Sequence, residues 1–274
     1  MIVKVCNSDY SLQWDGIYQF ALESYPQIKE WELEKLAKFI AYERDHHRQT
    51  NVECENHELN IQIHDYLQEH SYFPPYSPSH RLVASTYDIQ RKLVTSNYCS
   101  HTCTVEVAKA IFQTGKLMSA VKVFGKSGAE LVTDSRNAAS DPADYFDYIM
   151  FGWSNTTSGY RLAMERLLGR APSEEELQEK FIPGVSFHFL YEELIQAPGY
   201  MFDGYHVAKV RDSLDLDTFL HLCVIPSKDK SCFEGLIPCQ LQDRVIYLDY
   251  EGEGLQAWNT KVNQVLHGQD KLKE

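Results

Sequence analysis

Two residues, His101 and Arg161, have reactive side chains and lie at or just after the end of a predicted strand, where a ligand could reach them. His101 closes a short predicted strand and is followed directly by Thr102 and a helix. An imidazole both donates and accepts hydrogen bonds and titrates near neutral pH, so it can hold a hydroxyl group or move a proton. Arg161 follows a second predicted strand, and its guanidinium can grip phosphate oxygens with two parallel donors. These two side chains are the first candidates for chemistry.

The helix after His101 carries clear start and stop signals. Thr104 can cap its first turn, where Glu106 is favourable, and Gly115 can end it in a left-handed conformation. Its apolar stripe consists of Val107, Ala108, Ile111 and Phe112. We therefore expect a well-defined helix immediately behind the His-Thr pair.

This order of strand, His-Thr pair, helix with a late Ile, then Gly and Leu over residues 98–117 resembles the opening motif of the ADP-ribosyltransferase superfamily. The similarity is closest to the branch of bacterial toxins that modify DNA bases. The resemblance implies that NAD is a substrate and that His101, with Thr102 beside it, holds a ribose hydroxyl. It also implies that Tyr148 and Arg161 bind the cofactor, with Arg161 contacting its phosphate or assisting catalysis.

The chemistry of such a reaction suits a histidine at the end of a strand. Cleavage of the nicotinamide glycosidic bond passes through a sugar with oxocarbenium character, as in glycoside cleavage. The protein must therefore fix the ribose hydroxyls and stabilise developing positive charge. A hydrogen bond from a ribose hydroxyl to His101 meets the first need.

The sequence departs from the family pattern at the acidic residue that usually orients the ribose and activates the acceptor. The late predicted strand over 219–225 contains no Glu. Of the nearby carboxylates we take Asp217 as the candidate catalytic acid. The other acidic residues considered are Asp212 and Asp215 beside it, and Glu251 and Glu253 after a different strand. This departure bears on transfer activity rather than on the fold.

Less specific interpretations of the same residues remain open. His101 can simply satisfy its hydrogen bonds at a strand edge, and Arg161 can form an ordinary helix salt bridge with Glu165, four residues later. A non-catalytic binding or regulatory protein that keeps this fold is the main alternative function. A nuclease or hydrolase with carboxylates on separate strands is the third.

Other familiar motifs are absent from the sequence. It contains no CxxC pair, no HExxH helix, no GxSxG elbow, no Walker loop and no GxGxxG turn. We therefore expect no metal site and no cofactor other than NAD.

The elements that must position these residues fall into two regions. Apolar periodicity predicts helices over 31–44 and 59–67, and the proline-rich run at 72–78 interrupts the helical pattern. We place a helical N-terminal region at 1–75 and an α+β ADP-ribosyltransferase-like domain at 76–274. The strands of its mainly antiparallel sheet are expected at 97–101, 146–153, 185–191, 219–225 and 245–250.

Composition limits the classes of function further. With 274 residues, 43% of them hydrophobic, the chain can bury a substantial core, which excludes a disordered tail protein. A net charge of -13 opposes general coating of nucleic acids. The expected acceptor is a nucleic-acid base or a protein, and the acidic charge weakly favours a protein or a small acceptor. Seven cysteines in a chain of this length favour a reducing compartment. We expect a cytoplasmic protein with no membrane segment, such as a toxin or phage-defence effector.

Overall fold

The computed structural model describes residues 1–8, 12–14, 17–45, 47–70, 98–133, 142–201 and 206–270. The chain divides into two compact units, each assembled from separate segments. Unit 1 comprises Met1–Thr95, Ser127–Phe146 and Met201–Lys209, and unit 2 comprises Ser96–Lys126, Asp147–Tyr200 and Val210–Glu274. The boundary that the sequence predicts near residue 75 lies outside the described residues.

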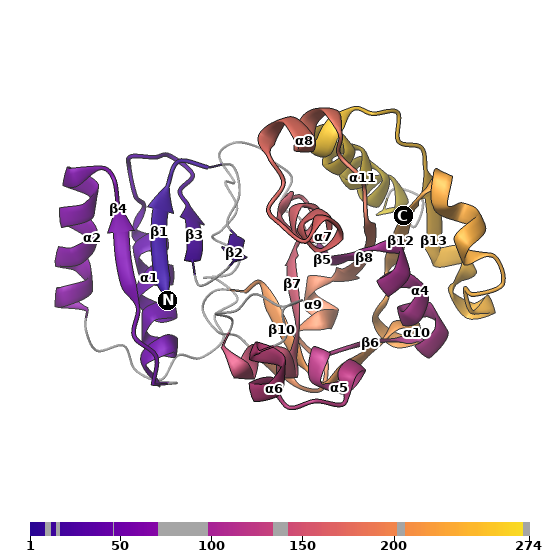
Figure 1. Cartoon of the computed structure of the whole chain (residues 1–274), viewed down its shortest axis with the longest axis horizontal. Coiled ribbons are helices and arrows are strands. Elements are labelled where there is room, and N and C mark those ends of the chain that lie inside the picture. Colours follow the sequence, from indigo (N-terminus) through magenta and orange to yellow (C-terminus); the bar gives the residue numbers. More distant parts are fainter. Residues whose placement is uncertain are drawn as a thin grey trace. The chain divides into compact units, whose positions relative to one another are not determined.

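The N-terminal part of unit 1 is built on a sheet rather than on helices alone, so the prediction of a helical N-terminal region was wrong. Its four strands lie in the order β2-β3-β1-β4, and Figure 1 shows β1 between β3 and β4. β1 runs parallel to both neighbours, and β2 pairs antiparallel with β3. The bounds are β1 Ile2–Cys6, β2 Leu12–Trp14, β3 Ile17–Ala21 and β4 Asn51–Cys54.

The physical reason for this sheet is the alternation of apolar residues in β1 and β3. Val3 and Val5 are buried while Lys4 between them is exposed, and Tyr18 and Phe20 repeat the pattern in β3. The two predicted helices do form, as α1 (Glu30–Asp45) and α2 (His57–Glu69). They contribute Leu33, Leu36, Phe39, Leu59 and Ile63 to the core cluster that also contains the strand residues.

A seven-stranded sheet with the strand order β13-β12-β8-β5-β7-β10-β9 has most of its residues in unit 2. β5 pairs antiparallel with β7 and β8, and β12 pairs antiparallel with β8 but parallel with β13. The expected α+β fold with a mostly antiparallel sheet is thus confirmed. The strands are β5 Tyr98–Cys103, β7 Tyr148–Trp153, β8 Val185–Leu190, β9 Tyr200–Met201, β10 Ala208–Arg211, β12 Leu222–Pro226 and β13 Val245–Leu248.

Helices and a small two-stranded sheet complete the two units (Figure 1). The helices are α4 Val105–Thr114, α5 Ala120–Phe124, α6 Gly128–Val132, α7 Ser158–Leu168, α8 Glu174–Glu179, α9 Tyr191–Leu194, α10 Leu216–Phe219 and α11 Gly254–Asp270. The 3-10 helices are η1 Ala143–Asp147, η2 Ser227–Phe233 and η3 Cys239–Arg244, and β6 (Lys116–Met118) pairs antiparallel with β11 (Ser213–Asp215). Two predicted strands start later than expected, because Phe146 belongs to η1 and Phe219 to α10.

The central sheet has two buried faces. The first, here called the α7 face, carries Tyr98, Leu222 and Val224 and packs in one cluster with residues of α7, α8 and α11. The second, called the α4 face, carries Phe151, Phe187 and Phe189, and the ring of Phe187 lies 5.3 Å from that of Phe112 in α4. Both faces of β8 are buried, because Ser186 and His188 are buried on the α7 face as completely as Phe187 and Phe189 are on the α4 face.

Candidate functional site

His101 lies near the end of β5, on the α4 face, and is partly buried. Its Nδ1 lies 3.3 Å from the backbone oxygen of Met150 in β7, and its ring meets that of Phe151 edge-on at 6.1 Å. A carbonyl oxygen can only accept, so Nδ1–H donates this bond and Nε2 carries the lone pair. The ring is thus fixed with one nitrogen occupied and the other able to accept a hydrogen bond.

The environment keeps this imidazole neutral. Burial lowers the pKa of His101 below its ordinary value, and the hydrogen bond to Met150 opposes this effect only in part. Nε2 has no hydrogen-bond partner among the described residues. A neutral imidazole with an open Nε2 can accept a hydrogen bond from a hydroxyl group or take up a proton.

The helix behind His101 has the ends that the sequence predicts. The side chain of Thr104 accepts a hydrogen bond from the backbone nitrogen of Val107, at 3.5 Å, and α4 begins at the next residue, Val105. Gly115 ends the helix with a φ of 68°, a conformation that favours glycine. The strand end that carries His101 is therefore followed by a helix defined at both ends.

Thr102 does not share a site with the His101 side chain, because successive residues of a strand point to opposite faces. Thr102 lies on the α7 face, where it pairs in register with Ser186. A Cβ placed on Gly159, in the first turn of α7, would lie 2.7 Å from the Thr102 hydroxyl oxygen. Thr102 is thus a packing partner of α7.

Arg161 belongs to α7 and is 6% exposed. Its Nη1 lies 3.2 Å from Oε1 of Glu174, the first residue of α8. Glu165, one turn after Arg161, is also buried, so these two residues are not the exposed helix pair considered from the sequence. Arg161 and His101 come from opposite faces of the sheet, because α7 covers the face to which Thr102 points.

The remaining candidate residues, Tyr148 and Asp217, belong to different elements, β7 and α10. Tyr148 begins β7 and alternates with the buried Ile149, so it points to the same side of the strand as Gly152, away from Phe151. Asp217 is exposed in the first turn of α10, and its backbone oxygen accepts a hydrogen bond from Arg244 Nη1 at 2.9 Å. His101 is the candidate that the α4 face presents.

A buried chain of hydrogen bonds on the α7 face was not predicted. His188 Nδ1 lies 2.9 Å from Ser154 Oγ, and its Nε2 lies 2.9 Å from Ser186 Oγ, to which Tyr160 Oη donates at 2.9 Å. All four residues are fully or almost fully buried. Burial, with a smaller effect of the nearby His221, lowers the pKa of His188 to about 3.

This series of hydrogen bonds resembles a nucleophile-base pair in its geometry but not in its chemistry. A base with so low a pKa takes up almost no proton near neutral pH, and Ser154 is too deeply buried for a substrate to reach. The serine and histidine types were visible in the sequence, but their contact depends on which strands pair. We infer that these hydrogen bonds stabilise the sheet.

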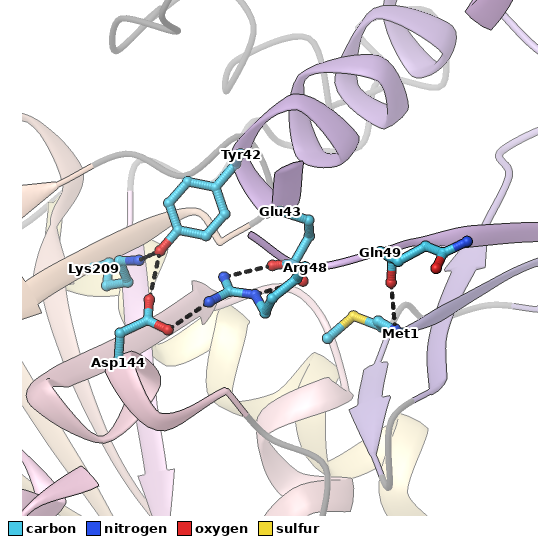
Figure 2. A network of polar contacts seen from close by, with 7 residues as sticks. All are labelled: Met1, Tyr42, Glu43, Arg48, Gln49, Asp144 and Lys209. Atoms are coloured by element: carbon cyan, nitrogen blue, oxygen red, sulfur yellow. Dashed lines mark hydrogen bonds and ion pairs between the residues drawn. The ribbon is translucent and has the colours of Figure 1, made fainter. Parts of the chain in front are cut away.

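Unit 1 contains a second unpredicted cluster, shown in Figure 2. The guanidinium of Arg48 binds both carboxylate oxygens of Glu43 at 2.8 Å and one oxygen of Asp144 at 2.7 Å. Tyr42 donates to the other Asp144 oxygen at 2.9 Å and accepts from the buried Lys209 amine at 3.0 Å. The cluster therefore joins α1 to two segments about a hundred or more residues away in the sequence.

Within the part of the chain that the structure describes, the charges of this cluster balance, with two cations and two carboxylates. Hydrogen bonds and charge interactions with Glu43, together with the charge of Asp144, raise the pKa of Arg48 above its ordinary value although burial opposes this. The rings of Tyr42 and Tyr145 also lie within 6 Å of both the Arg48 guanidinium carbon and the Lys209 amine. The cluster therefore needs no bound ligand to neutralise its charges. We infer that its role is to hold the segments of unit 1 together.

Three further properties bear on function. Among the described residues, no group of three or more His, Cys, Asp or Glu side chains could hold a metal ion. Within the same residues, no helix is long and apolar enough to cross a membrane. All seven cysteines are free thiols.

Comparison of the chain with family models, with curated proteins and with solved structures gives no match. Any assignment of function therefore depends on the residues themselves and on the sequence resemblance of the His101 segment.

Proposed function

We propose that the protein is an NAD-dependent mono-ADP-ribosyltransferase-like enzyme in which His101 binds a ribose hydroxyl. The observation that carries the proposal is the state of the His101 ring. Nδ1 is held by the Met150 oxygen, the imidazole is neutral, and Nε2 is open. An acceptor nitrogen of this kind, placed by a strand and a capped helix, suits a sugar hydroxyl in a reaction at the neighbouring glycosidic bond.

The other roles in the proposal come from the resemblance. Arg161 would bind a phosphate of NAD only after its ion pair with Glu174 has broken. Asp217 is the proposed acid and is exposed to solvent in α10. Thr102 supports the site indirectly, through its contact with α7, rather than beside the imidazole.

The proposed acceptor is a macromolecule, either a nucleic-acid base or a protein side chain. The net charge of -13 favours protein, because it repels a polyphosphate chain. The free thiols agree with a reducing compartment such as the cytoplasm, where a toxin or a phage-defence effector would act.

The test is calorimetric titration of the purified protein with NAD, followed by mass spectrometry for released nicotinamide. We expect binding by the wild-type protein, with release of nicotinamide, and loss of both in His101→Ala. His64→Ala is the matched control, because His64 is exposed on α2 and its Nδ1 also lies near a backbone oxygen, that of Asn60 at 2.8 Å. Absence of binding at millimolar NAD, or equal binding by His101→Ala, would overturn the proposal.

A second candidate function is a binding or regulatory protein that recognises NAD without cleaving it. Two observations favour it: β12 (Leu222–Pro226) carries no carboxylate, and Arg161 is already paired with Glu174. In the same experiment this function predicts NAD binding that depends on His101 but releases no nicotinamide.

A further inference from the structure

One buried guanidinium in unit 2 lies within reach of two carboxyl groups. Arg161 of α7 contacts Glu174 of α8, whose side chain is 74% exposed. Glu165 follows Arg161 by four residues, and side chains at this spacing are neighbours on one side of a helix. Arg161 can therefore serve either a carboxylate of its own helix or one of the next helix.

Glu165 is the unusual member of this group. It is buried, its Oε2 has no hydrogen-bond partner among the described residues, and no ion pair is formed by its carboxyl group there. An ionised carboxylate in this state lacks the compensation that a buried charge requires. Burial raises the pKa of Glu165 to about 7, although Arg166 and Arg161 lower it.

We propose that Glu165 and Glu174 compete for Arg161, so that loss of a proton from Glu165 moves the guanidinium away from α8. With Glu165 protonated, Arg161 pairs with Glu174 and joins the two helices. When Glu165 gives its proton to solvent, its carboxylate needs a cation, and Arg161 turns toward it. Glu174 then returns to water at little cost, because it is already largely exposed.

The surroundings contain few other groups that could take the place of Arg161. On α7 itself, Arg166 is the second cation that acts on Glu165. On α8, Glu176 pairs with Arg170 and Glu175 with Lys180, and Glu179 is exposed at the end of the helix. The residues of β5 and α11 that share the α7 core cluster are uncharged: Tyr98, Leu255, Trp258 and Val262. The titratable His188 of β8 reaches α7 only through Ser186, which accepts a hydrogen bond from Tyr160.

The consequence is a pH-sensitive connection between α7 and α8. The α8 helix keeps its capping box, in which Ser173 and Glu176 satisfy each other's backbone nitrogens, and its buried Leu177. Release of Glu174 therefore loosens the first turn of α8 without unfolding the helix. This inference does not depend on NAD binding and is tested without it.

The first experiment is NMR titration of the Glu165 carboxyl carbon in the wild-type protein and in Glu174→Gln. We expect titration near neutral pH in the wild type and a lower midpoint in Glu174→Gln, because Arg161 is then released from its competitor. Glu175→Gln is the matched control, since Glu175 is exposed in the same turn of α8 and pairs with Lys180. A wild-type midpoint in the usual range of glutamate, or equal midpoints in all three proteins, would overturn the proposal.

The second experiment measures hydrogen exchange in α8 with Glu165→Gln, which keeps the shape of the side chain but cannot ionise. The informative amides are those of Glu176 and Leu177, which are bonded to Ser173. Above pH 7 they should exchange about two to five times faster in the wild type than in Glu165→Gln, the size expected for one exposed ion pair. At pH 6 the two proteins should agree, and a ratio that does not change with pH would contradict the competition.

Discussion

The two histidines of β5 and β8 show how the partners of an imidazole decide its role. His188 has a hydroxyl group on each nitrogen and is fully buried. His101 has a backbone oxygen on one nitrogen and nothing among the described residues on the other. The first ring is locked into the sheet, whereas the second can take part in binding. A histidine in a strand therefore has to be judged by both of its nitrogens.

His188 should make the protein less stable in acid. Its pKa is about 3 in the folded protein and about 6.5 in the unfolded chain, so below pH 6.5 the unfolded state binds the extra proton. The stability contribution is complete above the unfolded pKa and is lost as the pH falls toward 3. The free energy of unfolding should fall by about 1.4 kcal/mol for each pH unit in that window from this group alone.

The measurement is urea denaturation between pH 7 and pH 4.5 for the wild type and His188→Gln, which cannot titrate. The unfolding free energy of the variant should depend less steeply on pH, by the amount that corresponds to about one proton bound on unfolding. His64→Gln, in an exposed position on α2, is the control for the replacement of a histidine by glutamine elsewhere in the chain. Parallel curves for the wild type and His188→Gln would show that His188 takes up its proton in the folded state.

The candidate site was predictable from the sequence only as far as residue type. His101 and its helix could be found because a strand end, a cap and a glycine are local signals. The opposite directions of His101 and Thr102 follow from the strand itself, but the place of Arg161 on the other face depends on where α7 docks. The pairing of Arg161 with Glu174 and the contact of His188 with Ser154 depend on tertiary packing. No local pattern encodes them.

At the scale of elements, helices with caps were predictable and the N-terminal sheet was not. Thr104 and Gly115 predicted the two ends of α4 correctly, because each cap acts within one turn of the helix. In unit 1, Val3 pairs with Tyr18 on one side and with Val52 on the other. Parallel pairing joins residues far apart in the chain, so a five-residue strand such as β1 gives little local evidence of it.

The docking of α7 on β5 should be sensitive to a single methyl group. Gly159→Ala would bring a Cβ to 2.7 Å from the Thr102 hydroxyl oxygen and 3.1 Å from its Cβ, so the helix or the strand must shift. We expect a loss of about 1–3 kcal/mol in unfolding free energy. Thermal or chemical denaturation measures it, and Thr102→Ala in the same protein should restore part of the loss.

Gly268→Ala is the matched control for this substitution. Gly268 also lies in a helix, α11, and a Cβ there meets no atom within 4 Å. Alanine should be neutral or stabilising at this position by up to about 1 kcal/mol, because glycine is the poorer helix former. If Gly159→Ala behaves in the same way, close packing between α7 and β5 does not determine their docking.

At the scale of the whole molecule, each unit is assembled from segments that are distant in the sequence. In unit 1 the cluster around Arg48 connects α1 with Asp144 of η1 and with Lys209 of β10 (Figure 2). The side chain of Glu43 is completely buried, and each of its carboxylate oxygens accepts a hydrogen bond from the Arg48 guanidinium. A buried ion pair of this kind adds little net stability. Removal of one partner is costly, because the other charge then stays buried and unpaired.

Arg48→Met should therefore destabilise unit 1 by about 3–5 kcal/mol, because Glu43 keeps a buried charge without its partner. Arg170→Met is the control: it removes an equally bidentate pair, with Glu176, at an exposed position and should cost at most about 1 kcal/mol. Adding Glu43→Leu to Arg48→Met should recover part of the stability, because the unpaired charge is then removed. Equal losses in the two single variants would show that the Arg48 cluster contributes no more than a surface pair.

Hydrogen exchange read by mass spectrometry shows where the destabilisation of Arg48→Met is felt. The cluster holds together α1, η1 and the start of β10, so exchange should rise first in these segments. Strands β5 and β8 are stabilised by a separate core and by the hydrogen bonds of His188, so their exchange should stay close to that of the wild type. A similar rise in both units would mean that the chain unfolds as one cooperative body, in which case the N-terminal sheet could not be removed without loss of the His101 strand.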